Sequence, residues 1–481
     1  MLVVLLAGQF MALLDVTIVN VALPTIGRSL HASGAEMQLV VAGYTVSYAT
    51  LLITGARLGD LAGRRRMFLA GTALFTLASL GCGLAPGIAV LIGARFVQGA
   101  GAAAMMPQIM SVIQVRFTGA ARARALSAYT AVLSSGFVAG QVAGGALVTA
   151  DLFGTSWRPV FLVNVPIGLA VLALVPRLMP ADAPAGRGAR GDRPAGPGRT
   201  RRLDLAGLSL AVPAVCLVVL PLMLGHQENW PGWLIACAGL GCALGAAFYF
   251  AERRVASRGG DPLLSLSVFR APGLLPGLAV ICVLMAGYGG FLFSLALHFQ
   301  AGLGDSALRA GLTFAPCALA FGLTGYFWRR LPGRSHPFLT TAGCLGGALG
   351  YAALAAAVRG GGQSELPLQA ALVVTGLSLA LAFSPVVTQA LVRVPPHQAA
   401  DASGLLTTAL QLSQAAGVAV FGSVFLTLDS RPAAARPAPS LMPGISGHAL
   451  AITLSLAAVT MMLGVVAAVP LVRTVLATRR D

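Results

Sequence analysis

The sequence predicts an all-helical protein whose helices cross a lipid bilayer. Of its 481 residues, 57% are hydrophobic and only 10% are charged, whereas soluble domains carry roughly 25% charged residues. Apolar runs of about 20 residues, the length that a helix needs to cross a bilayer, recur along nearly the whole chain. We predict fourteen spans, at residues 2–24, 36–56, 67–86, 88–115, 125–150, 158–180, 203–225, 231–251, 272–298, 307–328, 337–358, 366–392, 402–428 and 447–472.

The distribution of arginine predicts the orientation of these spans. All 32 basic residues are arginine. With the N-terminus inside, the inner loops and the C-terminal tail hold 25 arginines and the outer loops hold six, with Arg95 inside a span. Short cytoplasmic loops carry such an excess of positive charge. We therefore expect a multi-pass protein of the bacterial cytoplasmic membrane with both termini in the cytoplasm.

Composition also excludes several classes of function. Without lysine the chain has no Walker A motif and no Schiff-base lysine. The seven cysteines lie inside apolar runs and form no metal-ligand spacing with histidine, so we expect neither a metal site nor a disulfide framework. The net charge of +17 is not gathered on a soluble face, which argues against nucleic acid as a partner. We expect no cofactor.

An acid near the middle of the first span is the first candidate for chemistry. Asp15 there costs about 2.5–3.5 kcal/mol on insertion scales, and isolated intramembrane acids usually face a cavity and carry function. The alternative is a structural acid that pairs with a neighbouring helix. Gln9 and Asn20 are about 20° apart around a helix and form one face, so Asp15 points elsewhere or the helix unwinds.

The fourth span contains an equally costly charge. Arg95 lies three residues before Gln98, so the two side chains share one helix face. Arg95 is therefore a candidate partner for Asp15. The alternative is an arginine that extends to the membrane surface, because Arg95 lies early in its span.

Residues 55–66, GARLGDLAGRRR, are predicted to form a short inner loop between the second and third spans. Three consecutive arginines keep this loop in the cytoplasm. Its glycines allow the backbone to approach another helix closely. The alternative is an ordinary inside loop without a further role. The residues singled out here are Gly55, Gly59, Asp60, Gly63 and Arg64.

Glycines recur every four residues in the fifth span, and several polar residues lie in other spans. The glycine series predicts close helix packing, and a face for dimerisation is its alternative reading; the glycines are Gly136, Gly140, Gly144 and Gly145. His298 is expected near the outer end of its span, as a satisfied interfacial residue or as part of a proton relay. The candidate lining of a substrate cavity is Gln9, Asn20, Gln98, Gln141, Asn164, His298, Gln411 and Gln414.

Five of these stretches resemble motifs of the major facilitator superfamily. LDVTIVNVALP at 14–24 is similar to the first-span signature of its drug:proton antiporters, and G-x-x-x-G-D-x-x-G-R-R-R at 55–66 resembles its loop between spans two and three. R-x-x-Q-G at 95–99, the fifth-span glycines and WRPVFLVNVPIG at 157–168 resemble further signatures. Gln141 stands where the family usually has proline, so we expect no proline kink there.

The resemblance implies a fold and a mechanism. It implies two pseudo-symmetric six-helix bundles plus two extra central helices, as in the fourteen-span drug-exporting subfamily. It implies efflux of a small amphipathic drug-like or antibiotic molecule in exchange for protons, by alternating access, with the proton gradient as energy source and a monomer as the working unit. Asp15 and Arg95 then serve proton coupling. Asp60 is a conformational latch that docks on the helix start near residue 402.

The same resemblance divides the chain. We expect an N-terminal bundle at 1–180, a cytoplasmic linker at 181–202, two inserted helices at 203–251, a cytoplasmic loop at 252–271 and a C-terminal bundle at 272–481.

Two other functions compete with this hypothesis. The first is a proton-coupled or facilitative importer of a small nutrient, which calls for convergent polar groups in the cavity. The second is a membrane sensor or enzyme without transport activity. The sequence contains no H-E-x-x-H or G-x-S-x-G motif and no large soluble domain, which counts against the second.

Overall fold

The computed structural model describes residues 1–179, 205–224, 231–258, 266–359, 365–391, 394, 399–429 and 442–477, and long helices dominate them. The first group comprises α1 (Leu2–Leu30), α2 (Gly34–Ala62), α3 (Arg64–Gly83), α4 (Ile88–Arg116), α5 (Gly119–Ala150), α6 (Pro159–Leu162) and α7 (Asn164–Leu178). Two further helices are α8 (Leu205–Leu224) and α9 (Gly232–Ser257). The last group comprises α10 (Leu274–Leu297), α11 (Ala307–Phe327), α12 (His336–Val358), α13 (Glu365–Leu391), α14 (Ala399–Asp429) and α15 (Met442–Ala477).

The helices agree with the fourteen predicted spans. Each span contains one long helix, and α6 with α7 together fill the sixth. Eleven helical stretches among the described residues are long and apolar enough to cross a membrane. The protein is therefore a multi-pass membrane protein. Several helices run further than predicted, as α9 does by extending to Ser257.

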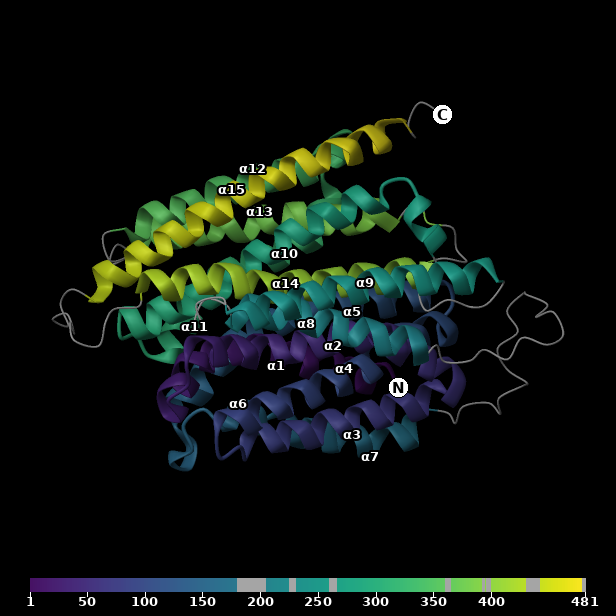
Figure 1. The fold of residues 1–481 in the computed structure, drawn as a ribbon, viewed down its shortest axis with the longest axis horizontal. Coiled ribbons are helices and arrows are strands. Elements are labelled where there is room, and N and C mark those ends of the chain that lie inside the picture. Colours follow the sequence, from purple (N-terminus) through teal and green to yellow (C-terminus); the bar gives the residue numbers. More distant parts are fainter. Residues whose placement is uncertain are drawn as a thin grey trace.

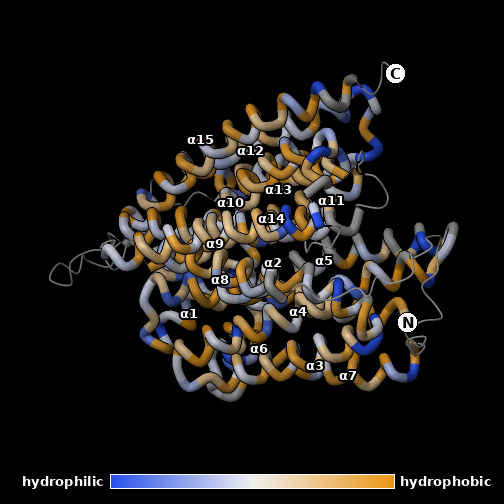
Figure 2. The backbone as a smooth tube through the Cα atoms, turned by 45° about the vertical axis from the view of Figure 1, so that its right-hand side comes forward, coloured by the Kyte–Doolittle hydropathy of each residue, from blue (hydrophilic) through white to orange (hydrophobic). Residues whose placement is uncertain are grey.

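The helices lie side by side along one direction in Figure 1. We call the end of the bundle where α1 begins and α15 ends the proximal end, and the opposite end, where α1 gives way to α2, the distal end. In Figure 2, hydrophobic residues run along the outward faces of α3, α7, α12 and α15, and hydrophilic ones gather nearer the helix ends. This distribution fits helices whose outer faces meet lipid.

One predicted loop is helical instead. The segment 55–66 contains a single non-helical residue, because α2 continues to Ala62 and α3 begins at Arg64. The break lies at Gly63, whose φ of 100° is a conformation that glycine adopts without steric cost. Gly55 and Gly59 do not interrupt α2; side chains there would collide with α4, at Ala103 and at Gln108 respectively. These two glycines permit close packing rather than a loop.

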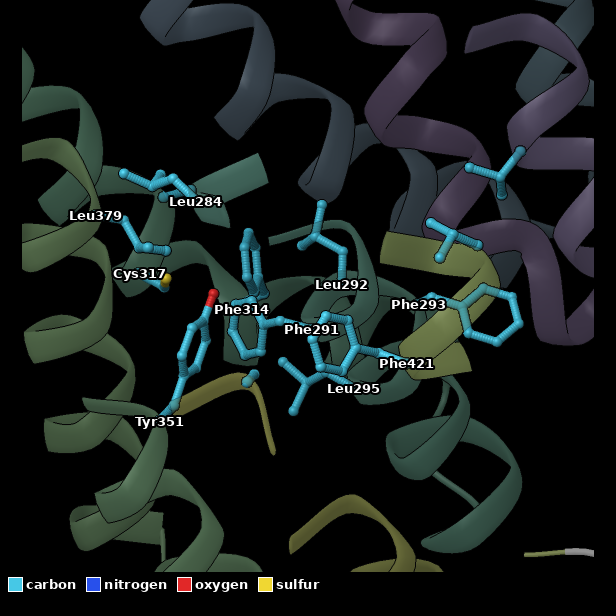
Figure 3. Packing of buried hydrophobic residues seen from close by; sticks show 14 of the residues in the cluster. Leu284, Phe291, Leu292, Phe293, Leu295, Phe314, Cys317, Tyr351, Leu379 and Phe421 are labelled. Carbon is cyan, nitrogen blue, oxygen red and sulfur yellow. The ribbon is translucent and has the colours of Figure 1, made fainter. Parts of the chain in front are cut away.

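The last group packs around an aromatic core. The ring of Phe291 on α10 lies 5.9 Å from that of Phe314 on α11 and 5.5 Å from that of Tyr351 on α12. Figure 3 shows the hydroxyl end of Tyr351 directed toward Phe314 and Cys317. Cys317 is buried there as a core residue.

Several contacts between the two groups lie at the distal end. The side-chain amide of Gln300 donates to the backbone oxygen of Val21 at 2.7 Å. The backbone N–H of Leu308 donates to the hydroxyl of Thr149 at 3.0 Å. The inserted helix α8 also contacts both groups, because Val219 packs with α2 and with α14 in one apolar cluster. The division of the chain into domains stays a prediction.

The crossing of α3 and α4 depends on two glycines. A Cβ at Gly101 would lie 2.6 Å from the backbone nitrogen of Phe75, and a Cβ at Gly71 would lie 2.7 Å from that of Met105. Backbone atoms cannot move aside as a flexible side chain can. The sequence therefore fixes a close helix–helix contact at this point.

We expect Gly101→Ala to lower the free energy of unfolding by about 1–3 kcal/mol, because the added methyl group overpacks the crossing. Thermal unfolding of the purified protein in detergent measures the change. Gly93→Ala is the matched control, since the same helix leaves open space around Gly93. Equal melting temperatures for the two variants would contradict the role of the crossing.

Candidate functional site

Asp15 lies at the middle of α1 and is fully buried. Helix α1 is continuous from Leu2 to Leu30, so it does not unwind at the acid. The carboxylate faces α4 and α7 of its own group, so the expectation that it faces a cavity does not hold in this structure. Its geometry is that of an acid paired with neighbouring helices.

Three donors surround the carboxylate. Oδ2 accepts from Nη1 of Arg95 at 2.5 Å, which is also an ion pair. Oδ1 accepts from Nε2 of Gln98 at 2.7 Å and from Nδ2 of Asn164 at 2.9 Å. All four side chains are 0–1% exposed. The structure thus brings together four of the residues singled out in the sequence.

Arg95 is fixed by further contacts on the distal half of α4. Its Nε donates to the backbone oxygen of Val40 on α2 at 3.0 Å, and its guanidinium lies 4.6 Å from the ring centre of Tyr44. The ring of Phe161 on α6 lies 5.8 Å away. Such a cation–π contact adds to the attraction when it is desolvated. Arg95 therefore does not extend to the membrane surface, and that alternative is wrong.

Gln98 links the acid, the base and α3. Its Oε1 accepts from Nη1 of Arg95 at 2.6 Å, as the shared helix face predicts, and its Nε2 donates to Oγ of Ser79 at 2.8 Å. The thiol of Cys82 lies 3.7 Å from the same Oε1. Ser79 was not anticipated from the sequence. Its signal is a stripe of hydroxyl residues at helical spacing on α3, namely Thr72, Thr76 and Ser79.

The other candidates on the first group lie away from this cluster. Asn20 donates to the backbone oxygen of Val16 on its own helix. Gln9 is buried, and Gln141 is buried where the backbone of α5 meets Gly311 of α11. None of the three contacts Asp15 through a hydrogen bond given for the described residues, so the site of Asp15 does not include them.

His298 directly follows the last residue of α10, at the end of its span. It is fully buried in a π-helical turn, His298–Gly302, and its Nδ1 lies 3.0 Å from the hydroxyl of Ser446 on α15. His298 is thus enclosed by protein, and its role as an interfacial residue or as part of a proton relay stays a prediction. On α14, Gln414 is buried against Gly289 of α10, and Gln411 is half-buried.

The glycines of the fifth span pack as predicted. Side chains at Gly136, Gly140 and Gly144 would meet Leu13, Thr17 and Ile18 of α1. Gly145 faces the other way, toward Ala307 and Leu308 at the start of α11. The first three glycines therefore pack α5 against α1, the helix that carries Asp15. Gly145 packs α5 against α11 of the last group.

The latch residues are placed in part. Gly55, Gly59 and Gly63 have the packing and break described above, and Arg64 begins α3. The side chain of Asp60 lies outside the described residues, and so do those at the start of α14. The latch stays a prediction.

Comparison with known proteins agrees with this architecture. The chain matches the model of the Major Facilitator Superfamily over residues 5–418. It is 37% identical over 431 residues to a probable actinorhodin transporter of Streptomyces coelicolor, an alignment that covers 88% of this chain and 72% of that protein. It is 35% identical over 425 residues to the multidrug resistance protein Stp of Mycobacterium tuberculosis, with coverage of 87% and 74%.

Among solved structures, the fold is similar to that of an inward-facing, occupied bacterial homologue of the human lysosomal transporter Spinster. The TM-score is 0.68 at 16% sequence identity, and the match covers 98% of this chain and 96% of that one. At this identity the likeness concerns the fold alone.

The buried ion pair leads to a stability prediction. We expect Arg95→Leu to cost about 3–5 kcal/mol, because it leaves Asp15 as a buried charge without its counter-ion. The double variant Asp15→Asn with Arg95→Leu should cost less than the sum of the single changes, since no charge is then stranded. Thermal unfolding of the wild type, the two single variants and the double variant gives the interaction free energy between the two side chains.

The matched control is the ion pair of Arg309 and Asp305, whose arginine is 64% exposed. Arg309→Leu should change stability by only about 0–1 kcal/mol, as exposed pairs do. Additive effects of the Asp15 and Arg95 substitutions would show that the two charges do not depend on each other.

Proposed function

The chain belongs to the Major Facilitator Superfamily, and on this premise we propose that it exports drug-like or antibiotic small molecules in exchange for protons. It is a transporter rather than an enzyme. The names of its relatives support export, because one is a probable actinorhodin transporter and another a multidrug resistance protein. Both alignments extend over most of each chain.

One observation carries the proton-coupled mechanism: the ion pair of Asp15 and Arg95 is sealed inside the first group of helices. Acids inside a membrane are costly and usually mark ion or proton pathways. A proton that binds Asp15 removes its charge and with it the attraction to Arg95. The contact between α1 and α4 then weakens, so protonation biases the packing of the helices that hold the pair.

Alternating access supplies the movement. In this structure the distal end is joined by the bonds from Gln300 to Val21 and from Leu308 to Thr149. We assign the distal end to the outside and the proximal end to the cytoplasm of the bacterial inner membrane, with both termini inside, on the strength of the arginine distribution. Substrate leaves when these distal contacts part, and a proton enters on the same side.

The substrate is a small amphipathic molecule that meets the transporter between its two groups of helices. We expect apolar side chains, with Phe and Met among them, to line this space, because such side chains tolerate many substrate shapes. The proton gradient is the energy source, no cofactor takes part, and a monomer in the bilayer is the working unit.

The test is efflux of ethidium from bacteria that lack their own exporters. Wild-type protein should export the dye, and a protonophore should stop it. Asp15→Asn removes the titrating group but keeps a side chain of similar shape, so we expect efflux to fall to the level of cells without the transporter. Immunoblots of the membrane fraction check that the variant is inserted in equal amount.

Asp151→Asn is the matched control, because Asp151 is an exposed acid in the loop after α5. It should export normally. If Asp15→Asn still shows protonophore-sensitive efflux, Asp15 is not part of proton coupling. If efflux by the wild-type protein continues in the presence of the protonophore, the protein does not exchange substrate for protons.

A second prediction concerns the distal contacts. The hydroxyl of Thr149 accepts from the backbone N–H of Leu308 at 3.0 Å, so α5 and α11 meet here, and we expect cysteines at both positions to form a disulfide on oxidation. Oxidation of the double-cysteine variant should link α5 to α11 and stop efflux, because the distal end can no longer part. Peptide mapping by mass spectrometry identifies the link, and a reductant should restore efflux.

Each single-cysteine variant is treated in the same way and should keep its activity. A fully linked double variant that still exports would show that these helices need not separate at this point.

A further inference from the structure

Asn164 presents a buried oxygen that has no partner. Its Nδ2 donates to Asp15, but its Oδ1 accepts no hydrogen bond among the described residues, although the side chain is fully buried. Unsatisfied buried acceptors are rare in folded proteins and call for a reason. Asn164 is the first residue of α7, directly after the interruption at Val163 that separates α6 from α7.

The reason lies in what Asp15 requires in its two charge states. As a carboxylate it accepts hydrogen bonds only, and its three partners here all donate. Once protonated, it carries an O–H that must donate. The guanidinium of Arg95 has no acceptor atom at any accessible pH, so it cannot accept a hydrogen bond from the O–H of the protonated Asp15.

Gln98 is held in its present orientation at both ends. Its oxygen accepts from Arg95 at 2.6 Å, and its nitrogen also donates to Ser79 at 2.8 Å. If this amide turned over, its N–H groups would face the N–H groups of the Arg95 guanidinium. The hydrogen bond from Nε2 of Gln98 to Ser79 would also be lost. Gln98 therefore stays a donor toward Asp15.

Asn164 is different, because one hydrogen bond fixes its amide. Rotation about the terminal side-chain torsion exchanges Nδ2 and Oδ1, and that torsion is broad and roughly two-fold. After the exchange, Oδ1, which has no partner in the present orientation, faces Asp15. It can then accept a hydrogen bond from the O–H of the protonated acid. No other hydrogen bond given for Asn164 is broken by this rotation.

We propose that Asn164 is a positioning residue that turns its amide over as Asp15 gains and loses its proton. It donates to the carboxylate and accepts from the neutral acid, so Asp15 keeps a partner on α7 in both states. This inference rests on the proposed function, in which Asp15 is the proton site. The titratable or charged groups near Asp15 are Arg95, Tyr44 on α2 and Cys82 on α3.

The exchange has a directional consequence. When Asp15 is neutral, α1 remains tied to α7 through Asn164, while its charge attraction to α4 is lost. Arg95 keeps its bond to Val40 and its contact with Tyr44, so it stays with α2. Proton uptake therefore weakens the tie between α1 and α4, which loses the charge attraction and keeps the hydrogen bond from Gln98, more than the tie between α1 and α7.

The experiment is infrared difference spectroscopy of the purified full chain in lipid, taken between high and low pH. The carboxylic C=O band that disappears in Asp15→Asn belongs to Asp15. Asn164→Leu removes both donor and acceptor at similar volume, and we expect that band to move to higher wavenumber, toward that of an acid whose O–H has no partner. Asn164→Ser, whose hydroxyl can donate or accept, should move it back toward the wild-type position.

Asn20→Leu is the matched control, because Asn20 is a buried asparagine on the same helix as Asp15 that bonds Val16 instead. It should leave the band in place. A band that Asn164→Leu does not move would overturn the role of Asn164 while leaving Asp15 as the proton site. If no titrating band depends on Asp15, the proposed function fails first. Asn164→Ala gives the same test where the leucine variant does not fold.

Transport assays in proteoliposomes add a readout that a purely structural role would not produce. We expect Asn164→Leu to lower proton-driven efflux about tenfold, the effect of one hydrogen bond, with an unchanged KM for ethidium. Exchange of ethidium for ethidium, which needs no change in the charge of Asp15, should continue at the wild-type rate. An equal loss of exchange and proton-driven efflux would contradict the proposal.

Discussion

The buried ion pair of Asp15 and Arg95 is the constraint on which the first group of helices depends. Two charges withdrawn from water are tolerated only when good geometry and additional hydrogen bonds compensate for their desolvation. Here the acid receives three donors, and the base also bonds Val40 and Gln98. Four helices are held in one arrangement because α1, α2, α4 and α7 each supply a partner. A displaced helix would leave a charge without one.

Small residues make this enclosure feasible. A Cβ at Gly99, next to Gln98, would press on the backbone of Tyr44, so α4 can approach α2 closely enough for Arg95 to reach Val40. Gly140 allows α5 to lie against α1 beside Thr17, and Gly168 allows α7 to lie against Thr76 of α3. Without attraction between apolar surfaces in lipid, such close backbone contact is a main source of helix association. The glycines therefore allow the helix approach that encloses the ion pair, as well as the packing of the whole bundle.

The spans and the two intramembrane charges can be predicted from sequence, because their signals are energetically large: an apolar run of sufficient length, or a charge inside one. The sequence makes Arg95 only a candidate partner of Asp15, and the structure shows that the two meet. Asn164 and Ser79 are neutral and inexpensive in a helix, so the sequence does not tell which of many polar residues bonds Asp15, as Asn164 does, or Gln98, as Ser79 does. The glycines and arginines of the segment 55–66 are typical of a loop and predict one, whereas in the structure only Gly63 interrupts the helix.

Helix α1 connects Asp15, the proposed proton site, to the distal contacts between the two groups. Asp15 and Val21 lie on the same uninterrupted helix, about 9 Å apart along its axis at about 1.5 Å per residue. Val21 accepts the bond from Gln300 of the last group. A shift of α1 that follows a change of charge at Asp15 therefore acts directly on a bond that joins the two groups at the distal end. Because Asp15 is enclosed here, the proposed coupling does not require a substrate to touch the acid. Under that proposal, the movement of one helix suffices.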